Sequence, residues 1–475
     1  MKKNQITRVL STILLLCAVS LKAEVKLPAI ISDNMILQQQ SNVILWGEAN
    51  PGRTVTVTTS WDGQKYTTQA DKKTGKWQLN AQTPKAGGPY EIIFSDGKPV
   101  TVKNILIGEV WLCSGQSNME MPMRGYRSQP VEGSQELLIK ASPDTPIRAF
   151  SVKKKISRIP EENCAGEWVE NTANDMSWIS ATGYMFAQYL QEVLQVPVGI
   201  IVSAWGGTII QAWMSPESLQ TFPSQDLSHL SNNSELKKAN LGSVLYLGML
   251  YPLRNYRIKG AIWYQGESNR LKAKLYEQLF PAFVKSLRKL WNQGDFPFYY
   301  TQIAPYNYEG ADSISSALLR EAQMHCLNTI PNSGMAVTLD IGAPRCIHPC
   351  QKKEVGHRLA YWALAKDYGK TIFAYQGPRY KSMEVKKGVA HLTFDQVSDG
   401  LAPIETELDY FEIAGADRKF YPAKAKLNYN TQKIEVKSDS VPEPVAVRYA
   451  FKNYVKGTLF DNFGLPASSF RTDNW

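Results

Sequence analysis

The stretch EVWLCSGQSNMEMPM spans residues 109–123, and the way it changes character decides the fold. An apolar run, typical of a buried strand, stops in a small polar turn that contains Ser114 and Ser117. Most turns rich in serine and glycine are only turns. A serine nucleophile here therefore requires a base, an oxyanion hole and a suitable fold from elsewhere in the chain.

Similar apolar runs recur along the middle of the chain and alternate with helical patterns. Strands are expected over 105–113, 198–204, 259–264, 296–303 and 335–341. Amphipathic helices are expected over 184–194, 243–253, 275–291, 315–327 and 352–368. Strands that are apolar on both faces and alternate with such helices indicate a parallel sheet covered on both sides. We therefore predict an α/β domain over residues 105–371.

Both flanks of this region are rich in short strand patterns. Residues 24–104 contain runs such as TVTVTTSW and YEIIFS, separated by turn signals such as NPG and KAGGP. That spacing predicts a β-sandwich-like accessory domain. Residues 372–475 return to short strands joined by Gly, Pro and Asp/Asn turns, and we expect this β-rich region to pack on, or extend, the α/β domain.

The first residues have the pattern of a secretory signal peptide. A basic start, an apolar stretch from Val9 to Leu21 and small residues near Ala23 predict removal of residues 1–23 and an exported protein, periplasmic or secreted. The apolar stretch is too short for a membrane span. Residues 1–23 contain four basic residues and no acidic one, so their removal lowers the net charge from +10 to about +6. Without a dense basic block, nucleic acid is not an expected partner.

The chain that remains after residue 23 contains an odd number of cysteines, so at least one is unpaired within the chain. They are Cys113, Cys164, Cys326, Cys346 and Cys350. Cys346 could pair with Cys350 in an oxidising compartment, and pairing among these two and Cys326 stays open. The absence of a CxxC pair argues against a structural zinc site.

Reactive residues are expected beyond the carboxyl ends of parallel strands. Four predicted strands lead into such sequences: CSGQSN, SAWGGT, YQGESN and DIGAPRCIHP. Among five histidines, only His348 follows a predicted strand end, and Pro349 stiffens the chain after it. The others lie in helical, strand or polar loop patterns: His229, His325, His357 and His391. Elimination therefore makes His348 the candidate general base.

Ser117 is the better placed of the two serines, because a serine at a strand-to-helix turn gains from the free N–H groups of the helix start. Gly206 and Gly207 allow close backbone approach, so an N–H there can donate to an oxyanion. Gln265 or Asn269 can supply a side-chain N–H. Glu267 is either a carboxylate partner or a buried structural acid. Substrate contacts are expected from Asn118, Trp205 and Asn269, with aromatic stacking on a sugar face as one role.

These segments together resemble sialate O-acetylesterases, which are carbohydrate esterases of the SGNH-type hydrolase superfamily. The resemblance rests on CSGQSNMEMPM (113–123), SAWGGTIIQAW (203–213), IWYQGESN (262–269), REAQ (320–323) and DIGAPRCIHPCQKKEVGHRLA (340–360), and on ISDNMILQQ (31–39) and GLPASSFRTDNW (464–475). It implies a three-layer α/β/α fold and removal of O-acetyl groups from sialic acids through an acyl-serine, without metal or organic cofactor. By position, Ser117 is the implied nucleophile and His348 the implied base. Ser117, Gly206, Gly207 and Gln265 are the implied oxyanion region.

One position departs from the family pattern. Where the family commonly has an Asp two residues before the histidine, this chain has Cys346. A thiol is a weak hydrogen-bond partner and stabilises an imidazolium poorly. A backbone carbonyl can orient His348 in a Ser–His dyad, which we prefer. Alternatively, Asp340 or Glu267 reaches the ring, or activity is impaired.

Acetylated xylan or other hemicellulose is the alternative substrate, and a glycan-binding protein without catalysis is the alternative function.

Overall fold

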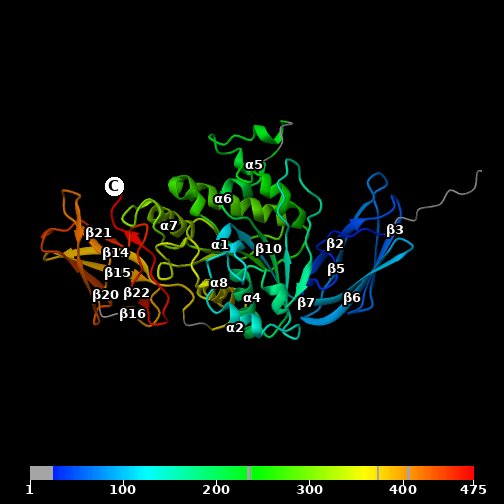
Figure 1. Cartoon of the computed structure of the whole chain (residues 1–475), viewed down its shortest axis with the longest axis horizontal. Helices are drawn as coiled ribbons and strands as arrows, with labels where there is room; N and C mark the ends of the chain where they lie inside the picture. Colours follow the sequence, from blue (N-terminus) through cyan, green and yellow to red (C-terminus); the bar gives the residue numbers. More distant parts are fainter. Residues whose placement is uncertain (1–24, 233–235, 237, 372–373, 404–406) are drawn as a thin grey trace, which may run out of the picture.

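The computed structural model describes residues 25–475 except 233–235, 237, 372–373 and 404–406. The predicted signal peptide and its cleavage site lie outside the described residues. The described chain forms three regions in a row along the longest axis of the molecule (Figure 1). N-terminal strands lie at one end, a mixed α/β region lies in the centre, and C-terminal strands lie at the other end.

The central region is built on a mainly parallel sheet with strand order β13-β12-β11-β7-β10-β8-β9. Its strands are β7 (Pro99–Gly115), β8 (Ile147–Ser151), β9 (Trp168–Glu170), β10 (Val198–Ala204), β11 (Gly260–Tyr264), β12 (Phe298–Thr301) and β13 (Ser333–Ala336). All neighbours along this order are parallel except β9, which is antiparallel to β8. The mixed α/β architecture predicted from the apolar runs is therefore confirmed.

The last predicted strand is shorter than expected. Residues 335–341 were expected to be extended, but β13 ends at Ala336. This strand lies at the edge of the sheet, and its single neighbour β12 ends at Thr301, opposite Ala336. Beyond this pair no ladder remains to hold the chain, so the segment that leads to His348 is a loop.

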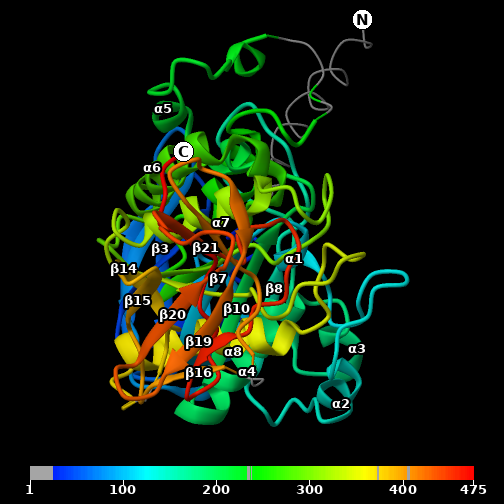
Figure 2. The same cartoon turned by 90° about the vertical axis from the view of Figure 1, so that its left-hand side faces the viewer.

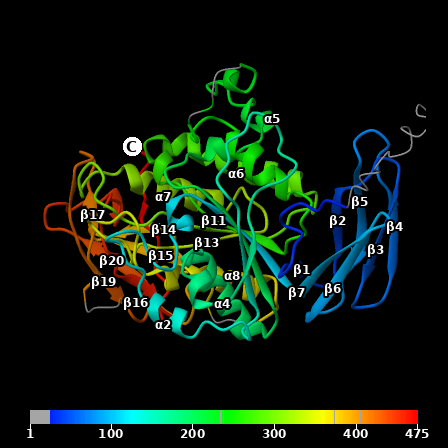
Figure 3. The same ribbon diagram turned by 45° about the vertical axis from the view of Figure 1, so that its right-hand side comes forward.

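Alternate residues of the strands enter two separate apolar cores, because successive side chains of a strand point to opposite faces. Trp111, Ile262 and Tyr299 belong to the core that includes helices α4 (Ala181–Leu194) and α8 (Lys352–Lys366). Their neighbours Leu112 and Trp263 belong to the core that includes α6 (Ala273–Trp291) and α7 (Ser315–Cys326). Figure 3 shows α4 and α8 on one side of the sheet and α6 on the other.

The helix expected over 243–253 is irregular, with an α-helical start at residues 244–245 followed by a π-helix and a 3₁₀ turn. Residues Tyr246–Leu250 form a π-helix (η3), and Tyr251–Leu253 form a 3₁₀ turn (η4) that contains Pro252. A proline has no N–H for a helical hydrogen bond, which explains the break. The other short helices are α1 (Ser117–Glu120), α2 (Ser134–Ile139), α3 (Ala173–Met176), η1 (Ile210–Trp213), α5 (Pro216–Leu219), η2 (Ser228–Leu230) and η5 (Glu267–Lys272).

The N-terminal strands continue into the central sheet through β7, which pairs with β1 and β6 before it enters the parallel part. The predicted boundary at residues 104 and 105 thus falls inside one strand. The strands of this region are β1 (Ile36–Gln38), β2 (Asn42–Glu48), β3 (Thr54–Thr59), β4 (Lys65–Gln69), β5 (Lys76–Gln82) and β6 (Gly87–Ser95). The pair β2–β5 packs against β6, with the rings of Trp77 and Phe94 5.9 Å apart.

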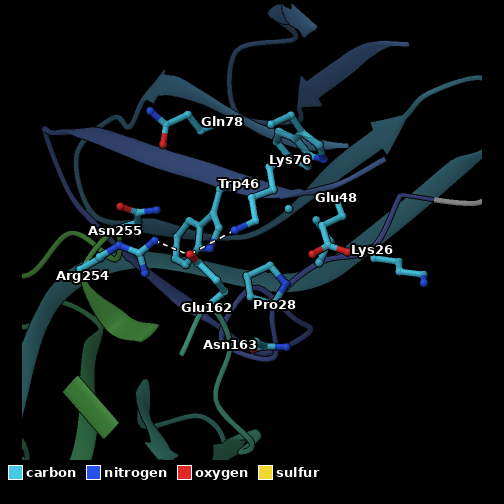
Figure 4. Close-up of a pocket in the computed structure, with 13 residues that line it drawn as sticks. Lys26, Pro28, Trp46, Glu48, Lys76, Gln78, Glu162, Asn163, Arg254 and Asn255 are labelled. Atoms are coloured by element: carbon cyan, nitrogen blue, oxygen red, sulfur yellow. Dashed lines mark hydrogen bonds and ion pairs between the residues drawn. The ribbon is translucent and has the colours of Figure 1, made fainter. Parts of the chain in front are cut away.

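A groove of about 630 Å³ lies where the N-terminal strands meet the central region. Figure 4 shows Glu162 between Lys76 and Arg254, with N–O distances of 3.1 and 2.6 Å. None of the residues that line this groove is a predicted catalytic, oxyanion or substrate-binding residue. The groove is therefore separate from the predicted site, and its ion pairs tie β5 to the central region.

The C-terminal region consists of strands in three small sheets, in front of the central region in Figure 2. They are β14 (Arg379–Lys386), β15 (Val389–Asp395), β16 (Leu401–Pro403), β17 (Phe411–Ala414), β18 (Phe420–Pro422), β19 (Lys424–Asn428), β20 (Lys433–Lys437), β21 (Ala446–Tyr449), β22 (Leu459–Asp461) and β23 (Phe470–Arg471). Buried Arg320 of α7 joins this region to the centre, donating to the carbonyl of Lys452 at 2.6 Å and to the hydroxyl of Ser469 at 3.0 Å. The predicted β-rich C-terminal region is confirmed.

The described cysteines are all free thiols, so the suggested bond between Cys346 and Cys350 is absent, and Cys326 is unpaired as well. Within the described part of the chain, no helix is both long and apolar enough to cross a membrane.

Candidate active site

The polar turn after β7 presents Ser117 at the carboxyl end of the sheet. Gly115 has φ +142°, and a Cβ at this position would lie 2.2 Å from the carbonyl oxygen of Tyr264. Glycine therefore lets β7 end directly against β11. Ser117 follows as the first residue of α1 and is half-buried. Ser114 is buried in β7, and its hydroxyl donates to the carbonyl oxygen of Ser203 at 2.6 Å, which is a structural role.

The sequences that follow β7, β10 and β11 meet at this turn. The side-chain oxygen of Gln116 accepts from the backbone N–H groups of Gly266 at 3.2 Å and Ser268 at 3.4 Å. Gly206 lies against Ser117, since a Cβ on this glycine would be 3.1 Å from Ser117 Cβ. The close contact between strand ends follows from their parallel arrangement.

His348 belongs to the same cluster although it lies in a long loop. Asn118 Nδ2 donates to the carbonyl oxygen of Ile347 at 3.1 Å, which joins the residue after Ser117 to the residue before His348. Tyr126 contacts both sides of this junction. Its ring packs edge-on against the imidazole with 5.2 Å between centroids, and its hydroxyl donates to the carbonyl oxygen of Ser117 at 3.3 Å. The loops that carry Ser117 and His348, the predicted nucleophile and base, are therefore in contact.

The imidazole of His348 is oriented by Gln129. Its Nδ1 lies 2.5 Å from Gln129 Oε1, an acceptor, so the proton is on Nδ1 and the lone pair is on Nε2. Gln129 is held in place by a tight turn in which Tyr126 and Gln129 exchange both backbone hydrogen bonds, at 2.9 and 3.1 Å. The turn that carries Tyr126 therefore also carries the partner of the base.

None of the residues suggested to orient His348 contacts its ring. The Cys346 thiol donates to the backbone carbonyl of His348 at 3.1 Å. Both oxygens of Asp340 accept from Arg358 at 2.7 Å. Glu267 Oε1 accepts from Asn118 Nδ2 at 2.6 Å. The expected backbone carbonyl is also not the partner, because the Gln129 side chain takes that place.

The environment of His348 keeps its imidazole neutral at ordinary pH. Burial disfavours the charged ring and, together with the positive charge of Lys352, lowers the pKa of His348 to about 4. A neutral ring with a free Nε2 lone pair is the form that accepts a proton from a serine hydroxyl.

The predicted oxyanion donors differ in availability. The N–H of Gly206 donates to Glu120 Oε2 at 2.5 Å, and Glu120 Oε1 lies 2.5 Å from Lys154 Nζ. Gln265 is fully buried, and its Nε2 donates to the carbonyl of Thr208 at 3.1 Å and to Asn269 Oδ1 at 2.8 Å. Both amide hydrogens of Gln265 are therefore engaged, and this residue supports the loop after β10. Gly207 has φ +74°, and the space where a Cβ would lie is open.

The expected substrate contacts are also partly structural. Asn269 Nδ2 donates to Gln211 Oε1 at 3.0 Å, and Asn269 is buried. Asn118 is fully buried and joins loops. Trp205 is half-buried beside Gly206, with Lys154 Nζ 5.3 Å from its ring centroid, so it is the member of this set that is not buried.

Sequence reasoning missed Gln129, Tyr126, Glu120 and Lys352. The first two lie in RGYRSQP, a polar loop with no periodicity that would place a side chain. Lys352 is one of two adjacent lysines at the start of α8, and nothing in QKKE shows that one of them is buried. The family pattern pointed only to the position of Cys346.

Comparisons with known proteins identify the family of this chain. The family described as "Carbohydrate esterase, sialic acid-specific acetylesterase" matches residues 107–364. A sialate O-acetylesterase from Mus musculus is 30% identical and covers 89% of each chain. The Homo sapiens protein of the same name is also 30% identical, over 89% of this chain and 87% of its own. The crystal structure of a carbohydrate acetylesterase from Xanthomonas citri aligns with a TM-score of 0.85 and 35% identity, over 95% of this chain and 100% of that one.

Proposed function

The chain belongs to the sialic acid-specific acetylesterase family of carbohydrate esterases, and from this premise we propose that it removes O-acetyl groups from sialic acids through an acyl-serine. That it is a carboxylic ester hydrolase acting on O-acetyl groups follows from the family itself. The observation that carries the serine mechanism is the hydrogen bond from Asn118 to Ile347, which joins the loops of Ser117 and His348 at 3.1 Å.

In the proposed first half-reaction, Ser117 Oγ attacks the acetyl carbonyl while His348 Nε2 takes the hydroxyl proton. The oxyanion is stabilised by backbone N–H groups of Ser117, at the first turn of α1, and of Gly207. The sugar oxygen leaves with the proton from Nε2, and the acetyl group stays on Ser117. Water then attacks the acyl-serine while His348 Nε2 takes its proton; the bond from the acyl carbon to Ser117 Oγ breaks, Oγ takes the proton back from Nε2, and acetic acid leaves and ionises to acetate.

Gln129 takes the place of the family's acid in this proposal. Its oxygen holds the Nδ1 proton, so Nε2 is presented to Ser117, but a neutral amide stabilises the imidazolium less than a carboxylate. This favours a working enzyme with a modified triad over a glycan-binding protein without catalysis. It replaces the dyad that the sequence suggested.

Gln129→Leu should lower kcat by about 10–100-fold, because the imidazole loses the partner that selects its tautomer and orientation. Gln129→Glu should keep kcat and raise the pKa of the acidic limb of the kcat/KM profile, because an anion stabilises the imidazolium. Both are measured by acetate release against pH. Cys346→Asp is the matched comparison. A large gain in kcat in Cys346→Asp, together with no loss of kcat in Gln129→Leu, would contradict the assignment of Gln129 as the partner of His348.

We also propose export and a division into regions. Residues 1–23 are the signal peptide, and the mature protein is periplasmic or secreted. Residues 24–104 are the accessory domain, 105–371 the catalytic domain with SGNH-hydrolase layering, and 372–475 the C-terminal region. The two apolar cores on opposite faces of the sheet support the layering.

The experiment that tests the substrate is acetate release by the mature chain from a panel of O-acetylated sialic acids and acetylated xylo-oligosaccharides. The proposal expects kcat/KM for at least one sialic acid to exceed that for every xylo-oligosaccharide. The reverse order would make the hemicellulose the substrate. Binding of these glycans without any acetate release would support the non-catalytic alternative.

A further inference from the structure

Behind the nucleophile turn, a buried lysine and a buried glutamate hold the two ends of one carboxamide. Lys352 Nζ, from α8, donates to Asn118 Oδ1 at 2.5 Å. Asn118 Nδ2 donates to Glu267 Oε1 at 2.6 Å, at the turn that follows β11. Lys352 and Asn118 have no exposed surface, and Glu267 is 3% exposed. The proposed reaction uses neither Lys352 nor Glu267.

This arrangement allows one orientation of the Asn118 amide. A rotation by 180° would turn the amide hydrogens toward the ammonium group and the amide oxygen toward the carboxylate, and both contacts would become repulsive. The same rotation would break the hydrogen bond from Nδ2 to the carbonyl of Ile347. The orientation of this amide therefore determines whether the residue after Ser117 is tied to the residue before His348.

The pair is poorly arranged for stability alone. Glu267 Oε2 is buried without a hydrogen-bond partner. Lys352 Nζ also lies 5.5 Å from the centroid of the Tyr264 ring. Burial lowers the pKa of Lys352 to about 7 and raises the pKa of Glu267, which reflects the free-energy cost of both charges. Well-packed apolar residues are often as stable as such a buried pair, or more stable.

We propose that Lys352 and Glu267 are positioning residues, which fix the carboxamide of Asn118 and thereby the spacing between Ser117 and His348. The inference rests on the proposed function, since it assigns these two residues to a Ser117–His348 mechanism. Neither residue touches the reacting atoms. Lys352 has a second effect, because its positive charge faces His348 and helps to keep the imidazole neutral.

The test is the paired variant Lys352→Met/Glu267→Leu in the mature chain, assayed with p-nitrophenyl acetate. The proposal expects kcat to fall about 10–100-fold, because a small misplacement of catalytic groups has an effect of this size. KM should change less than about threefold, and Tm should stay equal or rise. The acidic limb of the kcat/KM profile should move to higher pH, because His348 loses the nearby positive charge.

Glu109→Leu is the matched control for the loss of a buried carboxylate. Glu109 lies on β7, is 4% exposed, and accepts from Gln38, Gln39 and Tyr368 at 2.6–3.1 Å, so none of its partners belongs to the site. Its removal should lower Tm and leave both kcat of the folded fraction and the pH profile unchanged. A paired variant that behaves like this control, with lower Tm and full kcat, overturns the proposal.

Glu267→Gln is the second test, and it decides whether Glu267 is a positioning residue if the paired variant does not fold. The amide keeps an acceptor for Asn118 Nδ2 but has no charge, so kcat should stay within about threefold of wild type if position is what matters. A larger loss would show that the charge itself acts in the reaction, and would overturn the positioning role.

Ser117→Ala is measured alongside these variants. Activity in Ser117→Ala refutes the proposed function, whereas an inactive Ser117→Ala with a fully active paired variant refutes only this inference.

Discussion

Ser117→Ala should abolish acetate release from p-nitrophenyl acetate and from acetylated sialic acids, with kcat at least about 10³-fold lower than wild type. Without the hydroxyl no acyl-enzyme forms, and what remains is reaction of bound ester with water. The side chain is half-buried at the start of a short helix, and the change removes one oxygen atom. Circular dichroism and Tm should therefore match those of the wild type.

Ser114→Ala is the control for this prediction, because Ser114 lies three residues before Ser117, near the end of β7. The Ser114 hydroxyl is buried and donates to the carbonyl of Ser203 at 2.6 Å. Its loss should decrease the free energy of unfolding by about 1–3 kcal/mol, because a buried acceptor loses its partner. The kcat of the folded enzyme should persist. If Ser114→Ala were inactive and Ser117→Ala active, Ser114 would be the nucleophile and the assignment of Ser117 would be wrong.

The sheet could be predicted from sequence because its strands are buried on both faces. Val198–Ala204 is apolar apart from Gly199 and Ser203, and each of its residues is buried, so no alternation with polar residues obscures the strand. The end of β11 at Tyr264 was also predictable, because the polar Gln265 and a glycine follow directly. The end of β13 was not, because TLDI continues the apolar pattern after the neighbouring strand has ended.

The candidate site residues were chosen from sequence because they follow predicted strands, and of these His348 lies in the structure in a long loop after β13. Ser117, Gly206 and Glu267 lie in strand-end sequences, and parallel strands bring these sequences together. Gln129 reaches His348 from 219 positions away through an irregular loop, and only three-dimensional packing decides which polar side chain of a loop turns inward. The burial of Lys352 likewise depends on Asn118 and Glu267, which lie on other elements.

His348→Ala should lower kcat at least about 10³-fold and remove the acidic limb of the pH profile. In the wild type, protonated His348 cannot accept the serine proton, so kcat/KM falls as the pH drops through the pKa of His348. Because burial and Lys352 lower this pKa to about 4, activity should persist well below pH 6. In Ser117→Ala/His348→Ala the loss should be no larger than in either single variant, because the two residues act as a unit.

His357→Ala is the control for the titration. Burial also lowers the pKa of His357 to about 4, but this ring stacks on Tyr189 at 4.3 Å, in the contact between α4 and α8. Its removal should leave kcat and the acidic limb unchanged, although the two histidines titrate in the same range. If the limb disappeared in His357→Ala and remained in His348→Ala, the fall in activity would report acid-induced loosening of the helix pair instead of proton transfer at the serine. Tm measured across the same pH range separates these two explanations. Loosening of the helix pair lowers Tm together with the rate. Protonation of His348 lowers the rate while Tm still exceeds the assay temperature.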